Sequence, residues 1–231
     1  MAKVALNMTD RKAIGRAVSH FSDNRNLFKA FAIALMAQLE THSKLAPNIH
    51  FLKYRIKDPE HLRRKLERKV LEGKRSGKKV AFDKGNIFES IHDLVGIRLI
   101  HLHTEQLKEI HAAVQDIVEE QKYRLVEEPT ANCWDIEYEN LFKQIGIATR
   151  TRDSMYTTVH YIVEANQRTK ITCEIQVRTL MDEVWAEVSH RVNYPQESTS
   201  DVCKDQLKVL ARLTSGCTRL VDSIFKSREA E

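Results

Sequence analysis

The stretch from Ile171 to His190 constrains the fold of this chain most, because two structural periods meet in it. Its first part, ITCEIQVR, alternates apolar and polar residues, which is typical of a strand with one buried face. From Leu180 the apolar residues recur every four positions, as in a helix. Glu174, Gln176 and Arg178 therefore share the polar face of a strand that runs directly into a helix. A solvated outer face has the same pattern, so a functional interpretation depends on what other segments bring to this face.

The same two periods predict the other elements. Strands are predicted over 51–57, 97–102, 123–127, 156–165 and 170–179, the last two as a hairpin around Asn166-Gln167. Helices are predicted at about 9–20, 23–45, 59–71, 87–91, 105–120 and 202–226, and the stretch up to Thr151 is less regular. Because a hairpin needs antiparallel pairing and helices do not alternate strictly with strands, the predicted fold class is α+β, with a mixed five-stranded sheet flanked by helices.

Length and composition indicate one globular domain with helical additions. At 231 residues the chain can bury a substantial core. We expect an N-terminal helical extension over 1–46, a central domain over 47–195 and a C-terminal helical extension over 196–231. The longest apolar run, 28–39, is too short to cross a bilayer, and no signal-peptide pattern is present, so no membrane partner is expected. The four cysteines show no metal-binding spacing, which favours a cytoplasmic protein with reduced thiols.

Positive charge is concentrated in one segment. Between Lys53 and Lys84 there are 13 Lys or Arg against 5 Asp or Glu, a local charge of +8 in a chain whose net charge is +5. This distribution indicates a localised anion site. The glycine- and lysine-rich stretch 73–85 lacks the spacing of a P-loop, so we interpret it as a basic loop that could close over phosphates.

Two carboxylates lie among these cations at the ends or on the polar faces of the predicted strands. They are Asp93 and Glu174, and the cations are Arg55, Lys57, Lys65 and Arg98. Mg²⁺ is commonly held by one or two carboxylates together with substrate phosphates. The catalysis of phosphoryl transfer is mostly positioning and charge neutralisation. The pattern therefore predicts a site for nucleotide chemistry.

Four motifs together resemble those of the RelA/SpoT alarmone synthetase family. They are R-x-K at Arg55–Lys57 with Lys65 beyond it, D-L-V-G-I-R at Asp93–Arg98, Y-x-x-x-H at Tyr156–His160, and E-I-Q-V-R-T from Glu174 followed by W-A-E. They stand in the family's order, and the resemblance covers about residues 50–195. It implies a nucleotidyltransferase-like synthetase fold and a small, single-domain enzyme of a type that is often a homotetramer.

The resemblance also implies an activity and a donor site. In that family the pyrophosphate of ATP is transferred to the ribose 3′-hydroxyl of a guanine nucleotide. Carried over, Arg55 and Arg98 would sandwich the adenine. The ATP phosphates would be held by Lys57 and Lys65, with help from Arg64 or Arg68.

Catalytic and acceptor-binding roles follow from the same resemblance. Asp93 would bind Mg²⁺, and Glu174 would either bind Mg²⁺ or take the proton of the attacking hydroxyl. Tyr156 would stack on the acceptor base, in a pocket lined by His160, Gln176 and Arg152.

The acceptor segment departs from the family pattern. The family usually has K-x-N-G-Y-R-S-L-H, whereas this chain has RDSMYTTVH from Arg152 to His160. Arginine replaces the lysine, and the asparagine, the glycine and the following arginine are lost. Glu183 stands where related small synthetases often have asparagine, and His61 occupies a usual serine position.

Three hypotheses therefore stay open. The first is synthesis of (p)ppGpp from ATP and GDP or GTP. The second is a toxic relative, with or without an antitoxin partner, that pyrophosphorylates an adenine nucleotide or the 3′ end of tRNA. The third is a non-catalytic RNA-binding or interaction module, which would have no need of both Asp93 and Glu174.

Overall fold

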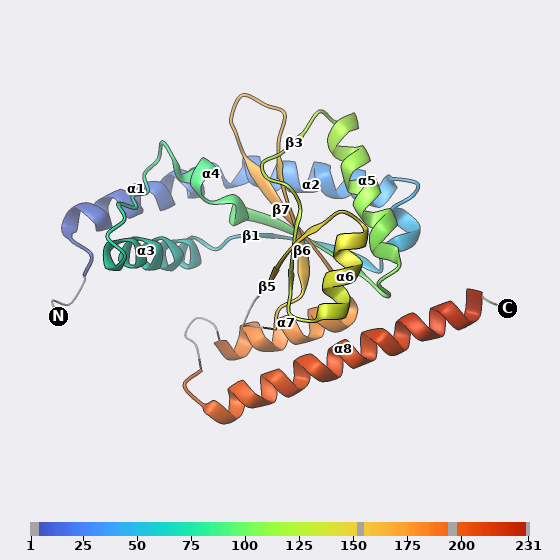
Figure 1. Ribbon diagram of the computed structural model, residues 1–231. Coiled ribbons are helices and arrows are strands. Elements are labelled where there is room, and N and C mark those ends of the chain that lie inside the picture. Colours follow the sequence, from blue (N-terminus) through green and yellow to red (C-terminus); the bar gives the residue numbers. More distant parts are fainter. Residues whose placement is uncertain (1–4, 152–154, 194–197, 230–231) are drawn as a thin grey trace.

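A mixed sheet of seven strands forms the centre of the molecule, in the order β1-β2-β7-β6-β4-β5 with β3 paired to β6 (Figure 1). The structure is a computed structural model that describes residues 5–151, 155–193 and 198–229. The strands are β1 (Phe51–Ile56), β2 (Val95–His101), β3 (Arg124–Leu125), β4 (Thr130–Cys133), β5 (Ala148–Thr151), β6 (Thr158–Glu164) and β7 (Thr172–Thr179). The pairs β2–β7 and β4–β5 are parallel, and the other pairs are antiparallel.

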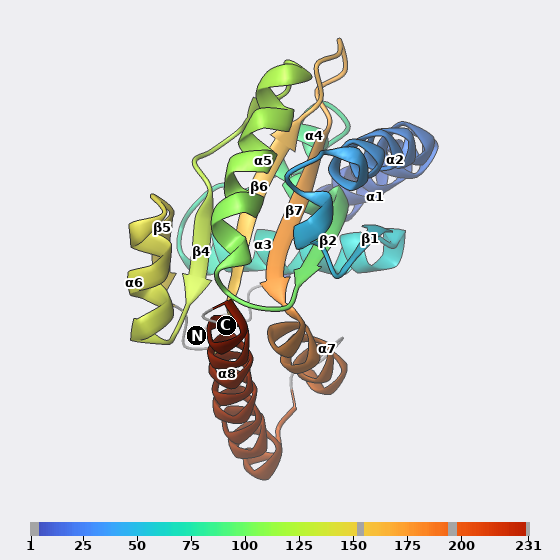
Figure 2. The same cartoon turned by 90° about the vertical axis from the view of Figure 1, so that its right-hand side faces the viewer.

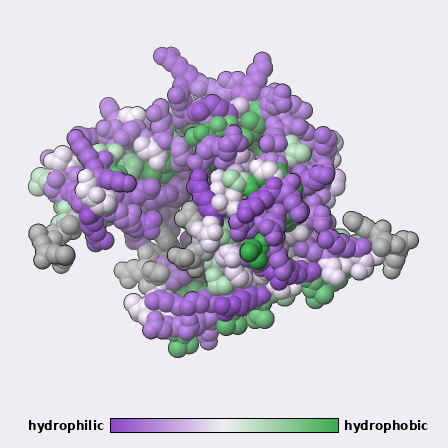
Figure 3. All heavy atoms as spheres, in the orientation of Figure 1, coloured by the Kyte–Doolittle hydropathy of each residue, from purple (hydrophilic) through white to green (hydrophobic). Residues whose placement is uncertain are grey.

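Helices surround this sheet. They are α1 (Met8–Asp23), α2 (Arg25–Thr41), α3 (Pro59–Arg75), α4 (Ile87–Ser90), α5 (Gln106–Glu120), α6 (Ile136–Gln144), α7 (Leu180–Asn193) and α8 (Asp201–Glu229), with short 3₁₀ turns η1 (Ala46–Asn48) and η2 (His92–Leu94). Among the described residues, no helix is both long enough and apolar enough to cross a membrane. Polar residues cover most of the surface that faces the viewer in Figure 3.

The prediction of an α+β fold with a mixed sheet is confirmed, but the number of strands was wrong. Two strands, β4 and β5, and the helix between them lie in the stretch that the sequence pattern left irregular. Each of these strands has four residues, which is too short for an alternating pattern. All four residues of β4 are buried, so no polar face marks it as a strand.

The two faces of the sheet have different characters. Apolar residues of the central strands, such as Ile97, Ile175 and Tyr161, belong to one core cluster with residues of α1, α2 and α5. Helices α2 and α5 cover this face (Figure 2), and the Tyr161 hydroxyl lies 2.9 Å from His111 Nδ1 of α5. The opposite face carries the polar residues, so the alternation in β7 separates the core from a candidate site.

Strand register aligns the polar residues across the sheet. Arg55 of β1 is opposite Gly96 of β2, and Gly96 is opposite Glu174 of β7. One step along the same face, Arg98 is opposite Gln176, and Gln176 is opposite His160 of β6. A Cβ atom at Gly96 would lie 3.3 Å from the Glu174 carbonyl oxygen, so β2 and β7 approach closely where the candidate residues converge.

Candidate active site

A cavity of about 1110 Å³ opens on the polar face of the sheet. The strands β1, β2 and β7 contribute to it, and α3 and the end of α7 complete it. Every residue predicted to bind ATP lines the cavity, together with both predicted catalytic carboxylates: Arg55, Lys57, Arg64, Lys65, Arg68, Asp93, Arg98 and Glu174. Segments far apart in the sequence thus bring the predicted donor side together in one place.

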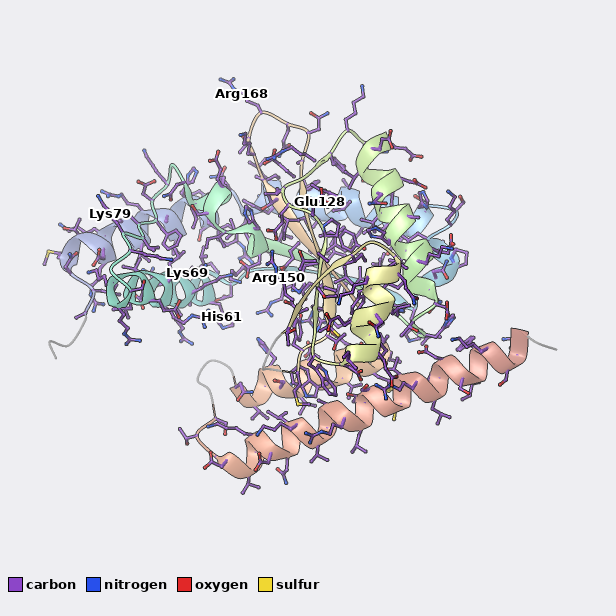
Figure 4. All side chains as sticks on the ribbon, in the orientation of Figure 1. His61, Lys69, Lys79, Glu128, Arg150 and Arg168 are labelled. Carbon is purple, nitrogen blue, oxygen red and sulfur yellow. The ribbon has the colours of Figure 1, made fainter. Side chains whose placement is uncertain are left out.

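Helix α3 presents its basic residues to the cavity because its start is fixed next to the sheet. Asp58 caps the helix by accepting hydrogen bonds from the backbone N–H groups of Glu60 and His61, and Pro59 occupies the first turn. In Figure 4, His61 lies at the end of α3 near the sheet, whereas Lys79 lies in the loop beyond the far end. Closure of that basic loop over phosphates stays a prediction.

Asp93 is held between two lysines. Its Oδ2 atom lies 2.7 Å from Lys57 Nζ and 2.6 Å from Lys65 Nζ. Burial raises the pKa of the Asp93 carboxyl, but the two ammonium groups outweigh burial and lower this pKa to about 2. Asp93 therefore carries a full negative charge at neutral pH, in the middle of the basic cluster.

The second carboxylate, Glu174, is oriented by its strand neighbours. Its Oε1 atom lies 2.7 Å from His160 Nδ1, and its Oε2 accepts a hydrogen bond of 2.8 Å from Gln176 Nε2. Burial raises the pKa of Glu174, but the hydrogen bond and charge of His160, together with the hydrogen bond from Gln176, outweigh burial, so the net shift is downward. Glu174 is thus an ionised carboxylate with a fixed direction.

One atom of the site fits a divalent cation. Asp93 Oδ1 is buried and has no hydrogen-bond partner, while Oδ2 is occupied by the lysines. A hard cation prefers such an anionic oxygen. The described residues contain no cluster of three or more metal-ligating side chains. One or two carboxylates plus substrate phosphates is the usual donor set for Mg²⁺, so Mg²⁺ binding by Asp93 and Glu174 fits this chemistry and stays a prediction.

Helix α7 supplies carboxylates that the sequence interpretation did not assign. Glu183 Oε1 lies 2.9 Å from Arg98 Nη1, and Glu187 also pairs with that guanidinium. His190, further along the helix, lines the cavity. These three residues stand at i, i+4 and i+7, so helical spacing after β7 is the signal that could have placed them on one face toward the site.

Of the predicted acceptor residues that the structure describes, one lines the cavity and the other two lie beside it. Gln176 lines the cavity, and His160 reaches it through its contact with Glu174. Tyr156 is half-buried, with its ring 6.2 Å from Trp185 and the Arg178 guanidinium 5.2 Å above the ring centre. Arg152 lies outside the described residues. Binding roles for these four side chains stay predictions.

Comparison with known proteins gives the family. The sequence matches the "Region found in RelA / SpoT proteins" over residues 54–199. No curated protein sequence matches the chain. Among solved structures, small alarmone synthetase 1 from Bacillus subtilis has a TM-score of 0.60 at 17% identity, covering 94% of this chain and 98% of that one.

Two further structures have the same fold. Small alarmone synthetase 2 from Bacillus subtilis has a TM-score of 0.60 at 21% identity, covering 89% of this chain and 98% of that one. Small alarmone synthetase 1 from Bacillus subtilis bound to its product pppGpp has a TM-score of 0.59 at 17% identity, covering 88% of this chain and 93% of that one. The family match spans more than half of the chain and contains Asp93 and Glu174, so this protein belongs to the RelA/SpoT family.

Proposed function

We propose that this protein is a cytoplasmic, ATP-dependent pyrophosphokinase that transfers the β,γ-pyrophosphate of ATP to the ribose 3′-hydroxyl of GDP or GTP, making (p)ppGpp. The observation that carries the proposal is the pair Asp93 and Glu174 on a cavity of about 1110 Å³ that is also lined by lysines and arginines. A solved relative carries pppGpp as its product, which supports a guanine nucleotide as acceptor.

The donor half of the site would act on ATP by position and charge. Arg55 and Arg98 would hold the adenine between them, since a guanidinium plane stacks on an aromatic ring. Lys57 and Lys65, which pair with Asp93, would turn to the phosphates when these enter. Asp93 Oδ1 would hold Mg²⁺, which when bound neutralises charge that develops on the phosphate oxygens.

The reaction would be a displacement at the β-phosphorus of ATP. The 3′-oxygen of the acceptor forms a bond to that phosphorus, the bond to the oxygen bridging the α- and β-phosphates breaks, and AMP leaves. Glu174 takes the proton of the hydroxyl, a role that an ionised carboxylate fixed by His160 and Gln176 can fill. Tyr156 would stack on the acceptor base.

The direct test is incubation with Mg²⁺ and ATP labelled at the β- or γ-phosphate, with GDP, GTP, ATP or bulk tRNA as separate acceptors. We expect label on GDP or GTP, and a Glu174→Gln variant about 100-fold slower because a positioned base is lost. Glu164→Gln is the matched control, since Glu164 pairs with Arg124 and, among the described residues, is not part of the cavity lining. Transfer that survives Glu174→Gln contradicts the role of Glu174.

A different acceptor is the second candidate, and the altered segment from Arg152 to His160 favours it. Label that moves only to tRNA or to an adenine nucleotide would support this candidate, and growth inhibition relieved by an antitoxin partner would then be expected. Transfer to no acceptor would contradict both enzymatic proposals and leave an RNA-binding or interaction module.

We also propose that the chain forms a homo-oligomer through α8. Exposed apolar side chains recur along this helix at Val202, Val209, Leu213, Leu220 and Ile224, and apolar residues mark its lower edge in Figure 3. Alternating steps of seven and four residues give an 11-residue period, which keeps such a row on one side of the helix. An antiparallel second copy centred on Leu213 would place Val202 against Ile224, because each lies 11 residues from Leu213. A dimer through α8 would need a second, different interface to form the tetramer that the family resemblance implies.

A further inference from the structure

Glu183 joins the two halves of the site through a buried ion-pair network. The residue is 8% exposed, and its two carboxylate oxygens contact different arginines. Oε1 lies 2.9 Å from Arg98 Nη1, on the donor side. Oε2 lies 3.2 Å from Arg178 Nη1, whose side chain is 2% exposed. One carboxylate therefore fixes two guanidinium groups that belong to neighbouring strands, β2 and β7.

Arg178 connects Glu183 to the acceptor side. Its guanidinium lies over the Tyr156 ring, 5.2 Å from the centre, and its Nη2 donates a hydrogen bond to Gln176 Oε1. Gln176 in turn donates to Glu174. A continuous chain of polar contacts thus runs from Arg98 through Glu183 and Arg178 to Tyr156 in one direction and to Glu174 in the other.

We propose that Glu183 is a positioning residue that couples occupation of the donor site to occupation of the acceptor site. This inference rests on the proposed function, because it takes Arg98 as an adenine contact and Tyr156 as an acceptor-base contact. Glu183 itself is absent from the cavity lining among the described residues, so it acts through the two arginines.

The expected coupling is positive. An adenine between Arg55 and Arg98 restricts the Arg98 guanidinium, and Glu183 transmits that restriction to Arg178 and hence to Tyr156. The acceptor then binds to side chains that are already ordered, so its binding costs less conformational entropy of the protein. By thermodynamic linkage, the acceptor raises the affinity for ATP by the same factor.

The chain offers a matched control in Glu187. This residue is on the same helix and pairs with the same Arg98 guanidinium, and its side chain is 40% exposed. Within the described part of the chain it has no ion pair with Arg178. Loss of the Glu187 charge should therefore remove one ion pair of Arg98 and leave the ion pair between Glu183 and Arg178 intact.

The experiment measures equilibrium binding of a non-hydrolysable ATP analogue and of GDP, each alone and with the other saturating, in the presence of Mg²⁺. For the wild type we expect each ligand to tighten the other by about five-fold or more. In Glu183→Gln this coupling factor should fall to about one, whereas Glu187→Gln should weaken analogue binding and keep the coupling factor. A Glu183→Gln protein that keeps the wild-type coupling overturns the inference.

Measuring pyrophosphate transfer and folding distinguishes failure of this inference from failure of the proposed function. A wild-type protein that transfers pyrophosphate but shows no coupling overturns this inference and leaves the proposed function in place. A wild type that binds neither nucleotide overturns the proposed function. Circular dichroism confirms that each variant folds. If Glu183→Gln does not fold, Glu183→Asp replaces it, since the shorter side chain keeps the charge but cannot reach both arginines.

Discussion

The residue whose charge matters most to the proposed chemistry is Asp93, because it pairs with Lys57 and Lys65 and leaves one oxygen for a cation. Asp93→Asn keeps the shape and removes the charge. We expect pyrophosphate transfer to slow by about 100-fold or more, which corresponds to about 3 kcal/mol of transition-state stabilisation. Steady-state rates over a range of Mg²⁺ concentrations measure this effect.

Asp116→Asn is the control for that prediction. Asp116 is a carboxylate on α5 that pairs with Lys44 on the surface, and its side chain is 40% exposed. Its variant should transfer pyrophosphate at the wild-type rate within about two-fold, since surface ion pairs contribute little. If both variants are equally active, Asp93 is not a ligand of the metal.

The low pKa of Asp93 also predicts a pH dependence of stability. A carboxyl whose pKa falls from about 4 in the unfolded chain to about 2 in the folded protein stabilises the fold fully only above the unfolded pKa. This contribution, at most about 2.5 kcal/mol, is lost as the pH falls from about 4 toward 2. Urea unfolding should therefore show a steeper loss of stability over this range in the wild type than in Asp93→Asn. Parallel curves would contradict the paired state of Asp93.

At the scale of elements, the close approach of β2 and β7 depends on Gly96. A valine there would place its Cβ 3.3 Å from the Glu174 carbonyl oxygen and extend into the cavity floor. We expect Gly96→Val to weaken binding of an ATP analogue about ten-fold and to destabilise the protein by about 1–3 kcal/mol, a typical cost of overpacking. Calorimetric titration and thermal unfolding measure the two effects.

Gly15 of α1 provides the comparison for that substitution. A Cβ at Gly15 would meet no atom within 4 Å, and valine has a better helix propensity than glycine. Gly15→Val should therefore leave analogue binding unchanged and stability equal or slightly higher. Weakened binding in Gly15→Val would show that the effect at position 96 is not local to the cavity.

The same elements show what the sequence could and could not predict. Strand β7 and helix α3 were predicted because alternation and a cap with proline are local signals. The parallel pairing of Gly96 with Glu174 was not predicted, because register between strands 78 residues apart depends on tertiary packing that no local pattern encodes. The donor residues were named from motif resemblance, and their convergence on one cavity required the fold.

The residues missed were those whose role comes from a tertiary partner. Glu183 differs from the residue common in related synthetases, but in sequence it and Glu187 resemble ordinary helix carboxylates, and only the fold shows that both pair with Arg98. Strands β4 and β5 were missed because four residues are too few to distinguish an alternating strand pattern from an irregular segment.

At the scale of the whole molecule, the exposed apolar row on α8 predicts self-association. Leu213 is 61% exposed at the centre of that row. Leu213→Asp would place a charge in an apolar interface, so we expect the molar mass from light scattering to fall toward the 26.8 kDa of one chain. Arg212→Asp changes the neighbouring exposed residue outside the row and should leave the mass unchanged. A wild type that is already monomeric contradicts the proposed oligomer.

The position of β7 in the sheet also determines when the candidate site can be completed during translation. This strand is the last in the chain, yet it lies between β2 and β6 and is the only link between the two halves of the sheet among the described strands. Glu174 is synthesised 81 residues after Asp93, a delay of roughly 4–16 s at ordinary rates of chain elongation. During that interval β2 has an unpaired edge, and the nascent chain has the predicted donor groups without the second carboxylate. If Glu174 has the proposed role, an incomplete chain should be inactive until β7 has been made and inserted.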